Sequence, residues 1–288
     1  MEDSILKTVI LPASLALIMF GMGLALTLAD FKRILQQPKA VVLGAFSQLI
    51  ILPLIAFGLL EIFGYTGSFA VGLIIIAACP GGATSNIITH VSKGDTALSV
   101  TLTAISSVVT IFSIPFLVNY ALSKYTGNAS SITLPLKDTV GALFIITLIP
   151  VGIGMLVRKL NSNFAIKADK VVRVASIIIF IAILAALILK NKQHLADYFS
   201  RAGIISLVLN VVTMGLGYLL ASLLKLSRKQ AITISIEAGI QNGTLALVVV
   251  ALITNAPADT VIIPAIYSLV MFFTGGFMMA YFGRKSSK

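Results

Sequence analysis

The feature that most restricts the fold of this chain is a carboxylate inside a long apolar stretch. Glu237 lies in the segment 235–244, SIEAGIQNGT, and apolar runs flank this segment on both sides. If the stretch crosses a bilayer, the acid lies near its middle, where an ionised side chain without a partner costs about 3 kcal/mol or more. An acid in that position indicates a functional site, and its neutralising partner has to be found elsewhere.

The composition supports a membrane protein. Hydrophobic residues make up 58% of the 288 positions and charged residues 11%, against about 45–50% and 25% in ordinary soluble domains. Nine apolar stretches are close to the length of about 20 residues that spans a bilayer as a helix: 5–29, 40–62, 68–92, 96–121, 138–157, 171–189, 202–224, 230–253 and 260–282. We therefore expect an all-α, polytopic, multi-pass protein of the cell (cytoplasmic) membrane with nine transmembrane spans in the lipid bilayer.

Charge and cysteine content exclude other classes. Basic residues collect in the loops after the first, fifth and seventh spans, for example at Lys32, Lys159 and Lys229. This predicts an N-out/C-in topology, because cytoplasmic loops are rich in Lys and Arg. We assign the net charge of +11 to these loops and expect no nucleic-acid partner.

Cys79 has no second cysteine to pair with, and no Cys/His cluster indicates a structural metal. The oligomeric state stays open, with a monomer among the possibilities.

Two of the nine spans contain helix-breaking residues. Residues 79–82, Cys-Pro-Gly-Gly, interrupt the third span, because proline lacks an N–H and the glycines loosen the backbone. In the eighth span, Gly239 and Gly243 are the weak points after Glu237. Irregular backbone at this depth is tolerated only beside protein or a wet cavity. Each broken span precedes one further span, and the topology makes the two antiparallel. We therefore predict an inverted-repeat secondary transporter with two broken crossing helices.

No Lys or Arg lies within the spans at the depth of Glu237, so its partner is a proton or a bound cation. A hard cation such as Na⁺ needs several oxygen ligands, and unwound helical segments expose carbonyl groups that can serve. The two breaks supply oxygen atoms from Ser85, Asn86, Gln241 and the carbonyls around Ala238 and Ile240, the span after the first break adds Ser99 and Thr103, and the second span adds Gln48. Their number favours sodium, because a proton needs no such cage. A proton-coupled carrier in which Glu237 titrates is the alternative.

The other ends of the breaks predict a second ligand. A half-helix begins after Gly82 and another near Gly243, and we expect their uncapped N–H groups to favour an anion. A carboxylate or sulfonate of the substrate would bind at Gly82, Ala83, Thr84, Asn242 and Gly243. A cation and a small organic anion bound side by side imply coupled uptake. An intramembrane enzyme is a remote alternative, because no span holds a central His or Lys to activate a serine.

Several separated motifs resemble those of the bile acid:sodium symporter family. They are CPGGATSN at 79–86 followed by KGDTALS at 93–99, EAGIQN at 237–242, and MFGMGL at 19–24 followed by Asp30 and Phe31. The similarity covers nearly the whole chain and is to the nine-span members. It implies that the crossing helices, 68–92 and 230–253, lie in a core domain. The core would comprise mainly 40–122 and 202–256, and a panel domain mainly 5–29, 138–189 and 260–282.

The resemblance also implies two sodium sites and a class of substrates. One site would use Ser85, Asn86, Ser99, Thr103 and Glu237; the other would use Gln48, Glu237, Gln241 and the carbonyls of Ala238 and Ile240. The family handles bile acids, sulfated steroids and smaller carboxylates such as pantoate. The last span, at 265–272, lacks the Trp-His-Asn of some bacterial relatives, so the resemblance does not decide among these substrates.

Overall fold

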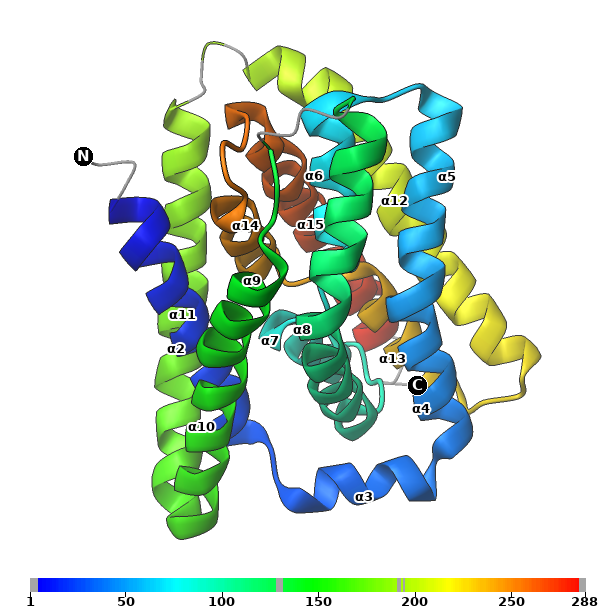
Figure 1. Ribbon diagram of the computed structural model, residues 1–288. Coiled ribbons are helices and arrows are strands. Elements are labelled where there is room, and N and C mark those ends of the chain that lie inside the picture. The colour runs from blue at the N-terminus through cyan, green and yellow to red at the C-terminus, as the bar shows by residue number, and fades with distance from the viewer. Residues whose placement is uncertain (1–4, 128–131, 191–192, 194, 285–288) are drawn as a thin grey trace.

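The computed structural model describes residues 5–127, 132–190, 193 and 195–284, which form a bundle of helices (Figure 1). In this part of the chain, seven continuous helical segments are long and apolar enough to cross a membrane: Thr8–Ala25, Pro38–Phe63, Thr96–Tyr125, Leu136–Leu160, Ser162–Leu189, Ala196–Leu223 and Ala258–Arg284. Each overlaps one of the predicted spans. The helical, multi-pass class is therefore confirmed.

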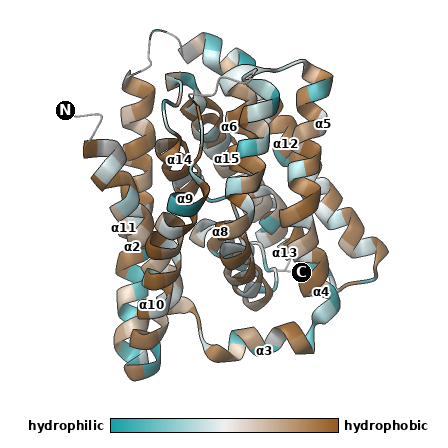
Figure 2. Ribbon diagram, viewed as in Figure 1, coloured by the Kyte–Doolittle hydropathy of each residue, from teal (hydrophilic) through white to brown (hydrophobic). Residues whose placement is uncertain are grey.

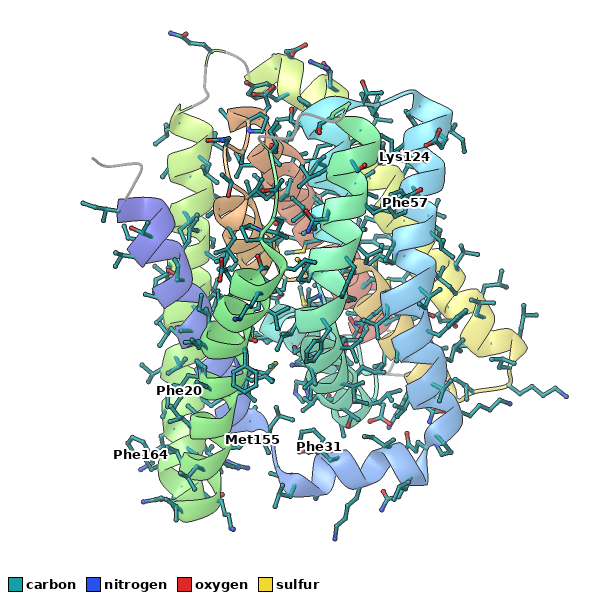
Figure 3. All side chains as sticks on the ribbon, in the orientation of Figure 1. Phe20, Phe31, Phe57, Lys124, Met155 and Phe164 are labelled. Carbon is teal, nitrogen blue, oxygen red and sulfur yellow. The ribbon has the colours of Figure 1, made fainter. Side chains whose placement is uncertain are left out.

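One group of helices, which we call the panel group, lies on the left of Figure 1. It consists of η1 (Leu6–Ile10), α2 (Leu11–Ala25), α9 (Leu136–Leu143), η3 (Phe144–Leu148), α10 (Ile149–Leu160) and α11 (Ser162–Lys190). Helix α2 packs against both α10 and α11. Glycines allow this close approach, because a Cβ at Gly23 would lie 2.2 Å from the carbonyl oxygen of Val151, and one at Gly154 would lie 2.4 Å from that of Phe20. Phe20 and Met155 mark the two helices in Figure 3.

A second group, which we call the core group, forms the rest of the bundle. It consists of α4 (Pro38–Phe46), η2 (Ser47–Ile51), α5 (Leu52–Phe63), α6 (Gly67–Ala78), α7 (Ala83–Val91), α8 (Thr96–Tyr125), α12 (Leu195–Leu223), α13 (Arg228–Gly239), α14 (Gly243–Leu252), η5 (Ala258–Val261) and α15 (Ile262–Arg284). Helix α8 packs against α6, and α12 packs against α13 and α15. Large apolar side chains such as Phe112, Phe116 and Leu54 remain 55–65% exposed on the outer helices, and the outer helices are largely apolar in Figure 2. A lipid environment accommodates such side chains.

Helix α15 belongs with the core group by its packing. We expected its span, 260–282, to lie mainly in the panel, yet α15 contacts α12, α6, α7 and α14. Small residues allow this contact: a Cβ at Gly275 would lie 2.7 Å from Ile88 Cδ1 of α7. The span's apolar composition carries no information about which neighbour it covers, so we group α15 by its contacts.

A further helix, α3 (Leu28–Gln36), joins the two groups across one end of the bundle (Figure 1). Its polar and apolar residues lie on opposite faces: Phe31 faces the bundle in Figure 3 and packs against the core, whereas Lys32 is exposed. The carboxylate of Asp30 caps its start by accepting a hydrogen bond from the N–H of Thr27 over 2.8 Å. The sequence predicts a loop at 30–39, between the first two spans, so the helix here is a correction.

The two predicted helix breaks are confirmed. Helix α6 ends at Ala78 and α7 begins at Ala83; α13 ends at Gly239 and α14 begins at Gly243. Helix α6 contacts α14, and α7 contacts α13, so the two broken helices cross. The four half-helices meet in the interior of the bundle, where neighbouring α8 and α15 cover them. Every residue from 231 to 250 is buried, including the polar Thr233 and Ser235 that precede the break.

Candidate ion and substrate site

The two breaks contact each other at the crossing. The N–H of Asn242 donates a hydrogen bond to the carbonyl oxygen of Pro80 over 2.8 Å, and Gly81 and Gln241 form an isolated antiparallel bridge. Backbone groups that the helices leave unpaired are thus satisfied by the opposite break, as buried irregular backbone requires. The ends of four half-helices are held around one point.

Glu237 lies beside this crossing, in the last turn of α13, and is 0% exposed. Its Oε1 accepts a hydrogen bond from Ser99 Oγ over 2.5 Å. Its Oε2 accepts one from Gln48 Nε2 over 2.8 Å and one from Thr103 Oγ1 over 3.1 Å. Within the described residues, no Lys or Arg forms an ion pair with this carboxylate. Its hydrogen-bond donors are neutral, so they solvate a negative charge without cancelling it.

The residues of the first predicted sodium site are brought together around this carboxylate. Ser99 Oγ lies 2.7 Å from Asn86 Oδ1 as well as 2.5 Å from Glu237 Oε1. A hydroxyl has one hydrogen, so it can donate to only one of these two acceptors at a time. Thr103 lies one turn further along α8, where its hydroxyl can donate either to Glu237 Oε2 or to the carbonyl oxygen of Ser99, 3.0 Å away. This concentration of oxygen atoms suits a cation.

Gly81 completes this arrangement because it has no side chain. A Cβ built there would lie 2.7 Å from Glu237 Oε2, 3.2 Å from Gln48 Nε2 and 3.3 Å from Ser85 Oγ. Three polar atoms from different elements therefore converge on the space beside this glycine. The Ser85 hydroxyl itself donates to the carbonyl oxygen of Gly82 over 2.7 Å, so it lies at the start of α7.

The residues of the second predicted sodium site form a matching pair of amides. Gln48 lies on the π-helical turn η2, ahead of Pro53, and its Nε2 donates to the backbone oxygen of Glu237 as well as to Oε2, both over 2.8 Å. Gln241 Nε2 donates to the carbonyl oxygen of Ala238 over 2.9 Å. The Oε1 atoms of both glutamines are buried and have no partner among the described residues. Rotation of each amide by half a turn would direct these oxygens to a cation in place of the NH₂ groups.

A cavity of about 350 Å³ lies next to this network. The residues predicted to hold the anion all line it: Gly82, Ala83, Thr84, Asn242 and Gly243. Asn86 and Gln241 line it as well, so the cavity and the carboxylate network share a wall. Its other side consists of residues from α2 and α11, including Met22 and Phe180.

One expectation about the half-helix starts is wrong. Asn242 Oδ1 accepts a hydrogen bond from the N–H of Leu245 over 3.0 Å, so α14 begins with a side-chain cap. This is the usual role of asparagine at an N-cap, and it removes one of the N–H groups expected to be uncapped. The Nδ2 of Asn242 is buried without a partner in the described structure and can still donate to a ligand. Helix α7 begins after Gly82 and has no side-chain cap.

Comparison with known proteins shows what kind of protein carries this site. Residues 12–198 match the Sodium Bile acid symporter family. The chain belongs to this family. It is 33% identical to the uncharacterized sodium-dependent transporter YocS of Bacillus subtilis (strain 168), over 95% of this chain and 83% of that protein. It is 30% identical to the ileal sodium/bile acid cotransporter of Cricetulus griseus, over 92% and 76% of the two chains. It is 28% identical to the probable sodium/metabolite cotransporter BASS2, chloroplastic, of Oryza sativa subsp. japonica, over 97% and 65%.

Membership of the symporter family confirms the resemblance read from the motifs and places the chain among transporters, not enzymes. The sodium-dependent relatives support sodium-coupled symport at the level of the family.

Three polar residues of the cavity were missed at the sequence level. Asp169, Arg173 and Ser176 line it from α11. The span was predicted to begin at 171, whereas α11 begins at Ser162 and carries these residues in the same helix as its apolar part. Of the three residues, only Asp169 lies outside the predicted span. Their spacing of four and three residues was the signal that could have placed them on one helical face.

Proposed function

We propose that the chain is a sodium-coupled symporter that takes up an organic anion across the cell membrane. The observation that carries this proposal is the buried carboxylate of Glu237, which has only neutral donors around it, next to a cavity lined by two half-helix starts. The anion would be a bile acid, a sulfated steroid or a smaller carboxylate such as pantoate. We count each broken pair of helices as one crossing, which gives nine spans in the N-out/C-in orientation.

Sodium is the partner that best suits the carboxylate. A buried carboxylate must be neutralised by a proton or a cation, because its uncompensated charge is too costly in a medium of low dielectric constant. The surrounding hydroxyl, carboxylate and amide oxygens would serve a hard cation, and the two unpaired Oε1 atoms of Gln48 and Gln241 have no use with a proton. The first ion would bind among Ser85, Asn86, Ser99, Thr103 and Glu237, and the second among Gln48, Glu237, Gln241 and the carbonyls of Ala238 and Ile240.

The anion would bind in the cavity at the starts of α7 and α14. The N–H groups there and the Nδ2 of Asn242 suit a carboxylate or sulfonate. A cation in the neighbouring network would strengthen this binding, because the two opposite charges would lie on either side of one break. Cation and anion would thus enter the protein together.

Transport would occur by alternating access. The cavity has α7, α14 and α15 on one side and α2 and α11 on the other, so it lies between the core group and the panel group. Motion of the nearly rigid core against the panel would expose the cavity to one side of the membrane and then the other. In this proposal the core comprises 40–122 and 202–256 with α15 added, and the panel comprises 5–29 and 138–189.

The substitution Glu237→Gln tests the cation site. Purified wild type should be more stable to heat in NaCl than in KCl, because a ligand that binds only the folded state stabilises it. We expect the variant to lose this difference whatever its absolute stability, since the neutral amide cannot compensate the ion's charge. The matched control is Glu61→Gln, which removes an acid whose side chain is 59% exposed and paired with Lys124. A variant at Glu237 that keeps the NaCl effect would refute the site, and a wild type that responds to pH but not to sodium would favour the proton-coupled carrier.

A further inference from the structure

One face of α11 carries a polar stripe that runs along the cavity, apart from the exposed Lys167 and Lys170 at the start of the helix. Asp169, Arg173 and Ser176 lie at spacings of four and three residues, so they occupy one side of the helix, and all three line the cavity. On the other side, Val174 and Ile178 are 52% and 61% exposed. Charged residues inside a spanning helix are costly unless they face the interior and serve a function. None of these three residues is among the proposed sodium ligands, so sodium binding does not account for them.

The stripe contains an ion pair and an unsatisfied hydroxyl. The guanidinium of Arg173 donates from Nη2 to Asp169 Oδ2, and the two side chains are 37% and 19% exposed. The Ser176 hydroxyl lies one turn further on; the residue is 7% exposed and its Oγ has no partner among the described residues. The pair has no net charge, yet Arg173 presents five N–H donors and Asp169 can accept several hydrogen bonds. Donors and acceptors are therefore both available in the cavity wall.

We propose that Asp169, Arg173 and Ser176 bind the end of the substrate that points away from the half-helix starts and select a hydroxyl group there. This assignment rests on the proposed function, in which the anionic end is held at α7 and α14. A hydroxyl both donates and accepts, so it can accept from Arg173 while it donates to Asp169 without breaking their pair. A second carboxylate would face the like charge of Asp169, and a bare hydrocarbon would leave the pair and Ser176 without added hydrogen bonds. The favoured class is a monoanion with a distal hydroxyl.

Three six-carbon acids test the selection: hexanoate, 6-hydroxyhexanoate and hexanedioate. Each is titrated against the purified full-length protein in NaCl and in KCl, with thermal stability as the readout. In NaCl, we expect 6-hydroxyhexanoate to bind roughly tenfold more tightly than hexanoate, as expected when hydrogen bonds to charged groups are added. Hexanedioate should bind more weakly than the hydroxy acid. Equal affinity for hexanoate and 6-hydroxyhexanoate would overturn the assignment.

The variant Asp169→Asn should change the order of affinity among the three acids, which a merely structural role of Asp169 would not do. It leaves the charge of Arg173 uncompensated, so hexanedioate should become the tightest ligand of the three. Arg173→Gln should remove the preference for the hydroxyl, while sodium stabilisation without any acid stays as in the wild type. The matched control is Asp197→Asn. It removes the ion pair of Asp197 with Arg201, which has the same i,i+4 spacing and a distance of 3.7 Å. This pair lies on α12 and does not line the cavity.

The outcomes separate this inference from the function it rests on. If sodium stabilises the protein and hexanoate binds, but Asp169→Asn keeps the wild-type order, the role of the stripe is refuted and the symporter proposal stands. If sodium stabilises the protein and no acid of the series binds, the assignment of the stripe is refuted, whereas a protein that sodium does not stabilise would refute the proposed function.

Discussion

Substitution of Gly81 by alanine should weaken sodium binding through a single methyl group. The glycine does not have a positive φ, so its backbone accepts alanine. The added Cβ would lie 2.7 Å from Glu237 Oε2, about 0.7 Å closer than ordinary van der Waals contact. Overpacking of this kind costs about 1–3 kcal/mol. The carboxylate is the end of a side chain and the nearest atom to the methyl group, so we expect it to move away from the position it needs to bind the ion.

The expected magnitude follows from mass action. A loss of about 1–3 kcal/mol raises the dissociation constant for sodium about 5- to 150-fold. At a sodium concentration 100 times the wild-type dissociation constant, the ion stabilises the wild type by about 2.7 kcal/mol. The same concentration should stabilise Gly81→Ala by only about 0.3–1.8 kcal/mol.

The assay is a sodium titration of thermal stability at constant ionic strength, with potassium as the replacing ion. The neighbouring variant Gly82→Ala is the matched control, because its Cβ would lie 3.6 Å from the nearest atom, on Asn242, and its φ of −117° suits alanine. It should titrate within about twofold of the wild type, or 0.4 kcal/mol. A Gly81→Ala protein with the wild-type sodium dependence would refute the geometry that places the carboxylate beside this glycine.

Three further predictions concern the second amide, the panel group and the motion. Gln48→Ala should weaken uptake at low sodium and recover in part at high sodium, as expected when a mass-action site loses one ligand; sodium dependence of uptake identical to the wild type would contradict the assignment. Gly154→Ala should lower the free energy of unfolding by about 1–3 kcal/mol, since its Cβ would meet a backbone oxygen at 2.4 Å, whereas Gly152→Ala, with open space around it, should be neutral in a thermal melt. Structures with and without sodium and substrate should superimpose within each group and differ between groups; a pair that differs only in side chains would oppose alternating access by rigid motion.

The central part of the site could be predicted because its signals are local. Proline and glycine break helices wherever they occur in a span, so both breaks were visible in the sequence. A lone acid in an apolar stretch must have partners, and polar residues at the breaks and in two neighbouring spans were the candidates. The structure brings Ser99, Thr103 and Gln48 to Glu237 from two other helical segments.

What the sequence could not supply is mostly a matter of packing. An apolar helix such as α15 reads alike whether it covers the core or the panel, and only its contacts with α12 and α6 assign it. The start of α11 was missed because Lys167, Asp169 and Lys170 place its first residues outside the apolar window, where charges are typical of a loop. The cap formed by Asn242 could not be predicted with certainty from the sequence, because an asparagine at a break can serve either as an N-cap or as a ligand.

The hydrogen bond between Asn242 and Pro80 has a consequence for energy coupling. It joins the two breaks at the residue that follows Gln241, so the proposed cation site, which includes Gln241, and the proposed anion site, which includes Asn242, are one peptide unit apart there. In a symporter with this arrangement, a displacement of the backbone caused by one ligand would reach the site of the other ligand directly. Linkage is reciprocal. The factor by which bound sodium raises the affinity for the anion is therefore also the factor by which the bound anion raises the affinity for sodium. Loss of the sodium gradient would then weaken binding of the organic anion as well as remove the driving force for its uptake.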